Sequence, residues 1–373
     1  MRFGDRVEVR PLGGGMGCLG MILFSAELFV NAIEWLGAKL KLAEGAVGSV
    51  LAATGTALPE TIIPIVAIIS DAATGRLGTP EAHSQSVGVG AIIGAPFMLG
   101  TLAFFIVGMT YFIARRRGRT QPFDVSGDVI KSDLSFFIIA FTIGCGAGVL
   151  HHYWEAMPHW LDVTIAIGLV VLYGLYLRKI LRSGGVVTHE SLDPLHIINH
   201  VPWGDANDPR RRWIALQLLI SLSLMFAGAH VFVQHFETLA NALHIPALIL
   251  ALLIVPVATE LPEKFNTILW VNRGKDTLAM GNISGAMVFQ STFPISLGLI
   301  FLSWDFDPFD PAIISAVLGV IGAVVVLLGL RKNNEVDPKA LLIGGTLWLL
   351  FVILVVMQEN GLHIMHIGEL PHH

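Results

Sequence analysis

Long apolar segments limit what this chain can fold into more than any other feature of its sequence. Ten windows of roughly 20 mostly apolar residues follow one another, and a helix of that length crosses the hydrocarbon core of a bilayer. They cover residues 15–37, 44–70, 85–113, 134–151, 159–180, 212–238, 246–271, 278–303, 310–330 and 340–358. A helix satisfies its own backbone hydrogen bonds in lipid, which an open strand cannot do. The sequence therefore predicts an all-α polytopic membrane protein with ten transmembrane helices.

The charge content agrees with that prediction. Charged residues make up 14% of the 373 residues and hydrophobic residues 54%, whereas about a quarter of the residues in a soluble domain are charged. Only residues 114–133 and 181–211 are polar for long enough to form substantial loops between the windows. Neither segment is long enough for a folded soluble domain, so we expect a membrane unit without a regulatory domain in its loops.

Lysine and arginine fall mostly on one side of the predicted membrane. Of the 23 such residues, 18 lie in the loops after the first, third, fifth, seventh and ninth windows. Four lie on the other side, and Lys264 lies inside a window. Because cytoplasmic loops carry the excess of Lys and Arg, we expect both termini to face outward. The expected location is the plasma (inner) membrane of a bacterium or archaeon.

Two related motifs indicate an internal repeat. The segment Gly-Thr-Ala-Leu-Pro-Glu at residues 55–60 returns as Ala-Thr-Glu-Leu-Pro-Glu at residues 258–263, an offset of 203. Each half of the chain contains five windows, and an odd number reverses the second half relative to the first. We therefore expect two inverted five-helix repeats, residues 1–180 and 212–373, joined by a cytoplasmic linker at residues 181–211. Such repeats hold their substrate between them near the membrane midplane.

Both motifs place a glutamate in the middle of an apolar window. A carboxylate at membrane depth is costly and is usually kept for a function. On a helix, residues four apart share a face, which pairs Thr56 with Glu60 and Thr259 with Glu263. Glu260 borders the second of these faces. Hard cations such as Ca²⁺ and Mg²⁺ prefer oxygen ligands of this kind, so the three carboxylates predict a cation site.

Prolines fall in the same windows. Pro59 and Pro64 lie in the second window, Pro256 and Pro262 in the seventh, Pro96 in the third and Pro294 in the eighth. A proline removes a backbone donor from a helix, and a broken helix is tolerated at membrane depth where it lines a cavity. We therefore expect broken helices at the midplane. Simple kinking, which is common in membrane helices, is the alternative.

These motifs resemble those of the cation/calcium exchanger superfamily, and within it the sodium/calcium exchangers. The two alpha-repeats of that family carry a G-T-S-x-P-E core and a G-N-x-x-G-S-N-x-x-N core on consecutive spans. Residues 55–60 and 258–263 match the first core, and residues 281–290 and 90–99 correspond to the second. The resemblance implies alternating-access exchange of cations at a midplane site.

The cation ligands implied by the resemblance carry over one by one. Two central glutamates, two threonines and one amide take the family's ligand positions: Glu60, Glu263, Thr56, Thr259 and Gln290. Leu99 stands at the first-half position that corresponds to Gln290, and its side chain cannot bind a cation.

The serine that follows the threonine in the family has changed in both repeats, to Ala57 in the first and to Glu260 in the second. Crowded carboxylates in a low-dielectric site cannot all ionise, so one of them tends to hold a proton. We hypothesise that Glu260, together with Glu263, binds a proton as an alternative to a cation. The competing interpretation is that Glu260 turns aside and pairs with Lys264, four residues further along its own helix.

A group of histidines follows the fourth window. His151, His152, Glu155 and His159 include a His-x-x-Glu spacing similar to that of some zinc ligands. No further residue suggests a catalytic metal centre, and a solvated outer loop is the simpler interpretation.

The function classes that stay open follow from these observations. Motifs of metalloproteases, serine hydrolases and phosphate loops are absent from the sequence, so we expect neither an enzyme nor a nucleotide-driven pump. The leading hypothesis is a secondary active antiporter that moves a divalent cation, with Ca²⁺ favoured and Mg²⁺ or Mn²⁺ as alternatives, in exchange for Na⁺ or H⁺. It would need no cofactor, and its partners would be metal cations and membrane lipid, not nucleic acid. A non-transporting membrane scaffold or sensor and a passive cation channel are the alternatives.

Overall fold

The computed structural model describes most of the chain as helix. The described residues are 10–39, 57–77, 79, 82, 84–125, 127–154, 157–182, 192–198, 205–243, 245–330 and 335–359. Within them, the only β-pairing is one isolated bridge between Leu330 and Val336. The α-helices are α1 (Arg10–Lys39), α4 (Leu58–Thr74), α5 (Val89–Met98), α6 (Phe104–Arg116), α7 (Gly127–Tyr153), α8 (His159–Arg182), α9 (Arg211–Leu243), α10 (Ala247–Thr259), α11 (Leu261–Asn272), α12 (Asp276–Gln290), α13 (Phe293–Phe301), α14 (Pro311–Leu328) and α15 (Pro338–Glu359). Two π-helical segments, η2 (Ser84–Gly88) and η3 (Leu99–Ala103), and one 3-10 turn, η4 (His196–Ile198), complete the list.

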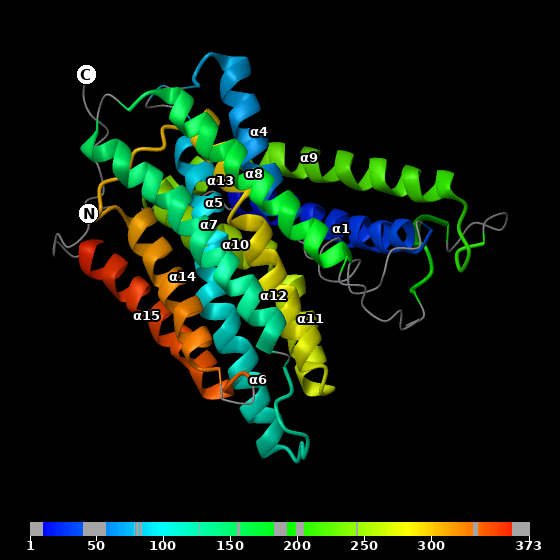
Figure 1. The fold of residues 1–373 in the computed structure, drawn as a ribbon. Helices are drawn as coiled ribbons and strands as arrows, with labels where there is room; N and C mark the ends of the chain where they lie inside the picture. Colours follow the sequence, from blue (N-terminus) through cyan, green and yellow to red (C-terminus); the bar gives the residue numbers. More distant parts are fainter. Residues whose placement is uncertain are drawn as a thin grey trace, which may run out of the picture.

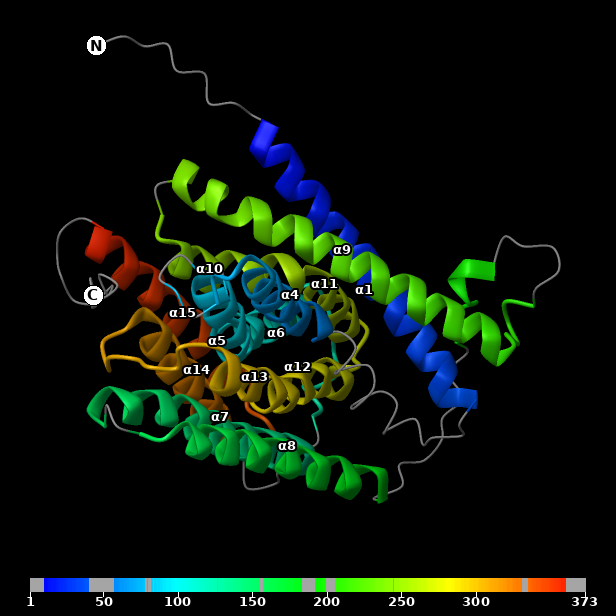
Figure 2. The ribbon, with the colours of Figure 1, turned by 90° about the horizontal axis from the view of Figure 1, so that it is seen from above.

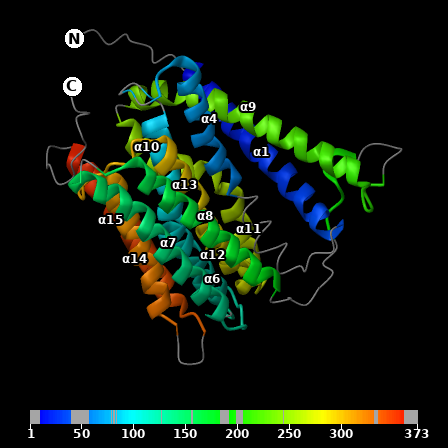
Figure 3. The same ribbon diagram turned by 45° about the horizontal axis from the view of Figure 1, so that its top comes forward.

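The helices surround a central group formed by α4, α5, α10, α12 and α13 (Figure 1). Seen from above, α1 and α9 run side by side along one edge of the molecule, and α7 and α8 lie along the opposite edge (Figure 2). Helices α14 and α15 cover a third side, and the tilted view keeps this arrangement (Figure 3). The central helices therefore lie shielded between three pairs of outer helices.

Helices cover most of each of the ten apolar windows where the structure describes it. Among the described residues, seven helical segments are long and apolar enough to cross a membrane: Ser84–Arg116, Gly127–Tyr153, His159–Lys179, Arg211–Phe236, Asp276–Phe301, Pro311–Leu328 and Pro338–Gln358. The predicted all-helical membrane architecture is confirmed at this level. The count of ten spans and the inverted relation of the two halves stay predictions.

The outer face of α8 has the character of a lipid-facing surface. Ile167, Val171 and Leu175 are each more than half exposed there, at 58%, 54% and 57%. Large apolar side chains exposed along one helix face are unusual on a soluble monomer. In a bilayer they contact acyl chains, because lipid tails solvate such side chains as well as a protein core does.

The prolines act as helix breakers at some predicted positions and not at others. The seventh window breaks at Glu260, and Pro262 stands in the first turn of α11. The eighth window breaks after Gln290, and Pro294 stands in the first turn of α13. Pro64, Pro96 and Pro256 instead lie inside helices that continue through them. The predicted helix break does not occur at these three positions.

Close packing of α5 against α10 holds the central helices together. A Cβ atom on Gly90 would lie 2.2 Å from the Cβ of Ala251, and one on Gly94 would lie 2.7 Å from the carbonyl oxygen of Leu252. That carbonyl has no helical donor because Pro256, four residues on, lacks an N–H. Small residues on α5 thus let its backbone approach the proline-containing segment of α10.

The two central spans, residues 84–116 and 276–301, run in opposite directions. At one end, Gln85 Nε2 donates to the Ser303 carbonyl at 2.8 Å, and the Ser303 N–H donates to Gln85 Oε1 at 3.0 Å. At the other end, Arg119 forms a buried ion pair with Asp276, in which Nη1 lies 3.0 Å from Oδ1. The start of each span thus meets the end of the other.

Candidate functional site

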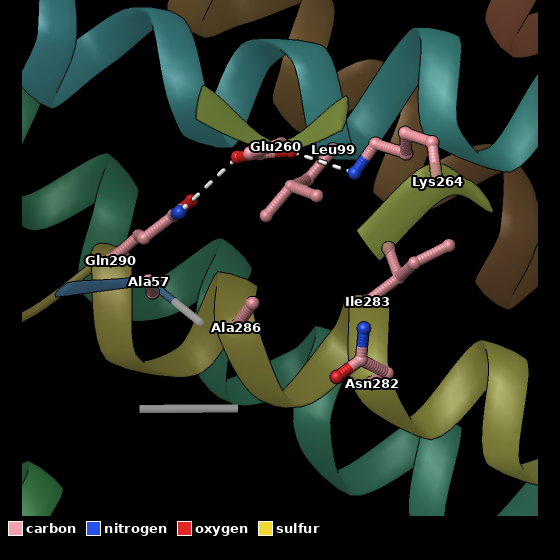
Figure 4. Close-up of a pocket in the computed structure, with 8 residues that line it drawn as sticks. All are labelled: Ala57, Leu99, Glu260, Lys264, Asn282, Ile283, Ala286 and Gln290. Carbon is pink, nitrogen blue, oxygen red and sulfur yellow. Dashed lines mark hydrogen bonds and ion pairs between the residues drawn. The ribbon is translucent and has the colours of Figure 1, made fainter. Parts of the chain in front are cut away.

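A small cavity lies beside the break between α10 and α11 (Figure 4). Its free volume is about 10 Å³, roughly the space that one water molecule needs. The residues that line it come from both halves of the chain: Ala57, Leu99, Glu260, Lys264, Asn282, Ile283, Ala286 and Gln290. The cavity therefore lies where the two halves of the chain meet.

Three polar side chains form a connected group on this lining. Lys264 Nζ donates to Glu260 Oε2 at 2.7 Å, and Gln290 Nε2 donates to Glu260 Oε1 at 3.3 Å. Figure 4 shows Glu260 between the other two side chains, with one contact to each. All three are buried, with exposures of 3% for Glu260, 7% for Lys264 and 1% for Gln290. A buried carboxylate needs such partners, because an unpaired ion at this depth is strongly destabilising.

The amide oxygen of Gln290 is not satisfied in the same way. Gln290 Oε1 is buried, and no donor in the described part of the chain forms a hydrogen bond with it. A buried acceptor without a donor costs about 1–3 kcal/mol. The nearby carboxylate of Glu260 and this carbonyl-type oxygen give the cavity the ligand chemistry that hard cations prefer.

Matched backbone geometry positions the two motifs. Ala57 has φ −86° and ψ 3°, and Glu260 has φ −95° and ψ 6°. Each residue precedes a new helix whose first turn contains the Leu-Pro-Glu sequence. Proline is favoured there because its missing N–H would be unpaired at a helix start in any case. Equivalent sequence positions in the two halves therefore have equivalent local structure.

The predicted site residues are distributed as follows. Glu60, Thr259, Glu260 and Gln290 are buried, and Glu260 and Gln290 line the cavity. Thr259 Oγ1 donates to the Val255 carbonyl at 2.9 Å. Thr56 lies outside the described residues, and for Glu263 the structure describes only the backbone, in the first turn of α11. The part that these residues take in binding a cation stays a prediction.

Two features differ from the simplest sequence interpretation. The prediction that Thr259 and Glu263 share a helix face assumed a continuous helix, whereas the helix breaks at Glu260 between them. Glu260 also pairs with Lys264, as the competing interpretation required, and still faces the cavity. The described side chains hold no group of three or more His, Cys, Asp or Glu placed to share a metal ion.

Sequence reasoning passed over one lining residue, Asn282, and one nearby carboxylate, Asp133. Asp133 on α7 accepts a hydrogen bond of 2.7 Å from the Tyr176 hydroxyl and another of 2.7 Å from the Ser284 hydroxyl. Ser284 belongs to the same α12 segment as Asn282. Asp133 stands at the edge of an apolar window in the sequence, and this position could have indicated it. It was passed over because residues 114–133 were assigned to a loop outside the membrane.

The histidines at the end of α7 and the start of α8 lie close to carboxylates. His151 and His152 lie in the last turn of α7 and not in a loop. His151 Nε2 lies 2.9 Å from Asp162 Oδ1, and His159 Nδ1 lies 3.6 Å from Asp162 Oδ2. Glu155 lies outside the described residues. The His151–Asp162 contact ties α7 to α8 at their connecting end.

Comparison with known proteins identifies the family. The family model described as "Sodium/calcium exchanger protein" matches residues 11–180 and 213–360. The chain belongs to the sodium/calcium exchanger family. Members of this family are transporters and not enzymes, and the resemblance inferred from the motifs is confirmed. The protein is therefore an integral membrane protein of the cation-exchanger type.

Individual relatives of the family are distant but match over most of their length. The chain is 23% identical to the inner membrane protein YrbG of Escherichia coli (strain K12) over 88% of this chain and 92% of that protein. It is 24% identical to the putative antiporter CaxA of Alkalimonas amylolytica over 89% of this chain and 96% of that protein.

Two solved structures have the same fold. The crystal structure of the H⁺/Ca²⁺ exchanger CAX superimposes with a TM-score of 0.68 at 15% identity, covering 93% of this chain and 82% of that one. The sodium-calcium exchanger NCX_Mj superimposes with a TM-score of 0.56 at 16% identity, covering 92% and 98%. At this identity the likeness concerns the fold alone.

Proposed function

We propose that the protein is a secondary active antiporter that moves a divalent cation in exchange for Na⁺ or H⁺ by alternating access. Ca²⁺ is the favoured cargo, with Mg²⁺ and Mn²⁺ as alternatives. The proposed ligands are Glu60, Glu263, Glu260, Thr56, Thr259 and Gln290. The proposal rests on the family and on a buried cavity at a helix break.

The single observation that carries the proposal is that the Gln290 oxygen beside the Glu260 carboxylate accepts no hydrogen bond from the described part of the chain. Both groups are buried, and both line a cavity between the two halves of the chain. Oxygen ligands at membrane depth are costly unless a cation or a donor satisfies them. Such an arrangement is suited to the transport of a cation through this position.

The proposed architecture is ten spans in two inverted repeats, with both termini outside and the linker at residues 181–211 in the cytoplasm. The opposite directions of residues 84–116 and 276–301 support the inversion, because these segments are the third span of each half. The similar backbone angles at Ala57 and Glu260 support the equivalence of the halves. Alternating access then consists of one part of the molecule rocking against the other around the fixed site.

Cation-dependent stability in detergent tests the binding half of the proposal. A ligand that binds only the folded protein raises its melting temperature by mass action. We expect Ca²⁺, or else Mg²⁺ or Mn²⁺, to raise the melting temperature of the wild type, and Glu60→Gln and Glu263→Gln to weaken that effect. If no cation stabilises the wild type, a non-transporting scaffold is the better description. Uptake that proceeds without any counter-ion gradient would indicate a channel.

A further inference from the structure

The charged pair at the cavity occurs in only one of the two repeats. At the offset of 203 residues, Glu260 corresponds to Ala57 and Lys264 corresponds to Thr61. In the first repeat the Thr61 hydroxyl donates to the Ala57 carbonyl at 3.2 Å, and neither side chain carries a charge. In the second repeat both positions are charged, with opposite signs, and form an ion pair. The second repeat thus differs from the first by one acid and one base together.

The Lys264 ammonium lies inside the candidate site and not on a helix surface. Lys264 and Glu260 are both buried, and both line the same cavity as Gln290. An exposed pair at this spacing contributes little to stability. A buried pair is costly to desolvate and is often no more stable than an apolar replacement. Stability alone is therefore a weak reason for this pair.

We propose that the Lys264 ammonium is a tethered counter-cation of the transport site, which neutralises Glu260 and takes the place of one coupling cation. This inference rests on the proposed function. It adds a residue that sets how many mobile cations the site can exchange. The cargo competes with the ammonium only for the Glu260 oxygens.

The charge of the site follows from this assignment. The ammonium cancels the charge of the Glu260 carboxylate, so in the wild type this carboxylate needs no mobile cation for charge balance. Moving net charge through the low-dielectric interior is costly. The number of monovalent cations that return in place of the divalent cation should therefore be one fewer with the ammonium than without it.

Removal of the ammonium changes this balance. In Lys264→Met, the Glu260 carboxylate is unpaired, and the site needs one more monovalent cation when it returns without the divalent cation. Exchange by this variant should then move one more monovalent charge per cycle, so its response to membrane voltage should differ from that of the wild type. Lys179→Met, which removes an exposed lysine near the end of α8, is the matched control and should behave as the wild type does.

The test uses purified protein in liposomes, with Ca²⁺ flux measured at zero voltage and at an imposed potassium diffusion potential. Absence of Ca²⁺ exchange in the wild type under any Na⁺ or pH gradient would refute the proposed function itself. Wild-type exchange with the same voltage response in Lys264→Met would overturn only the role of Lys264. A voltage response of Lys264→Met that differs from that of the wild type supports it.

A second comparison keeps the inference testable if Lys264→Met does not fold. Glu260→Gln keeps a neutral oxygen but leaves the ammonium without its carboxylate. Because the ammonium then repels Ca²⁺, we expect the Ca²⁺ affinity measured by thermal stabilisation to fall by about tenfold or more. The double variant Glu260→Gln/Lys264→Met removes that repulsion and should recover most of the loss. A double variant as weak as Glu260→Gln would show that the ammonium has no electrostatic effect on the cargo.

Discussion

At the scale of single residues, the buried carboxylates of this protein have distinct surroundings. Glu260 is paired with a lysine and an amide inside the cavity. Asp133 is 3% exposed and instead accepts hydrogen bonds from two hydroxyl groups, those of Tyr176 and Ser284. These hydrogen bonds connect α7 to α8 and to α12, so Asp133 holds the outer pair of helices against a helix of the site.

Asp133→Ala should therefore destabilise the protein more than a single lost hydrogen bond would. It leaves the hydroxyls of Tyr176 and Ser284 without their acceptor, at a cost of about 1–3 kcal/mol for each buried group. The measurement is the apparent melting temperature in detergent. Tyr176→Phe, which removes one donor and leaves the Ser284 contact, should cost less. Equal melting temperatures for Asp133→Ala and the wild type would contradict this account.

Sequence reasoning could find the acidic residues of the site but not their partners. From the sequence, Glu260 could either face the cavity or pair with Lys264, four residues further along. In the structure it does both. What decides the arrangement is the position of Gln290 on α12, 30 residues further along the chain. Local periodicity carries no information about a contact of that range.

At the scale of helices, two sequence-equivalent glycines have different surroundings. A Cβ on Gly90 would collide with Ala251, whereas one on Gly281 would meet no atom within 4 Å. Gly90→Ala should therefore destabilise the protein by about 1–3 kcal/mol through overpacking. Gly281→Ala should be neutral or stabilising by up to about 1 kcal/mol, because alanine favours a helix. Similar melting temperatures for the two variants would mean that α5 and α10 are less closely packed than the structure indicates.

The start of α14 gives a prediction about pH. Asp310 Oδ1 accepts a hydrogen bond from the Ala312 N–H at 2.9 Å, just before the apolar span begins. Burial raises the pKa of the Asp310 carboxyl to about 6; the Ala312 N–H opposes this shift and the Asp307 carboxylate adds to it. The folded state therefore holds this proton more tightly than the unfolded state, whose pKa is near the ordinary 3.8.

From the sign of this shift, the contribution of Asp310 to stability is largest at low pH and is lost as pH rises from about 4 to about 6. Asp310→Asn can still cap the helix but has no proton to lose. We expect the melting temperature of the wild type to fall relative to that of Asp310→Asn over this interval. Parallel pH curves for the two proteins would argue against a raised pKa.

Helix positions were largely predictable, while helix interruptions were only partly so. Apolar windows gave the correct segments because a spanning helix is specified by its length and composition. Prolines marked the breaks before α11 and α13, but the helices that contain Pro64 and Pro256 continue through them. At Pro256 the carbonyl left without a donor lies against Gly94, and that contact between separate helices cannot be read from either segment alone.

At the scale of the whole molecule, three outer pairs of helices surround a central group that carries the candidate site (Figure 2). The central spans are tied to each other at both ends, by Gln85 with Ser303 and by Arg119 with Asp276. Helices α1 and α9 pack mainly against each other and touch the rest chiefly through α4. This arrangement is compatible with movement of the α1–α9 pair across a more rigid centre.

The central claim is that the protein couples the movement of a divalent cation to that of another cation. Uphill uptake tests it most directly: purified protein in liposomes with equal Ca²⁺ on both sides, given an outward gradient of Na⁺ or of H⁺. The account predicts that Ca²⁺ accumulates inside under at least one of these gradients and that Glu60→Gln and Glu263→Gln do not accumulate it. Ca²⁺ that never exceeds its external concentration under either gradient would contradict the account.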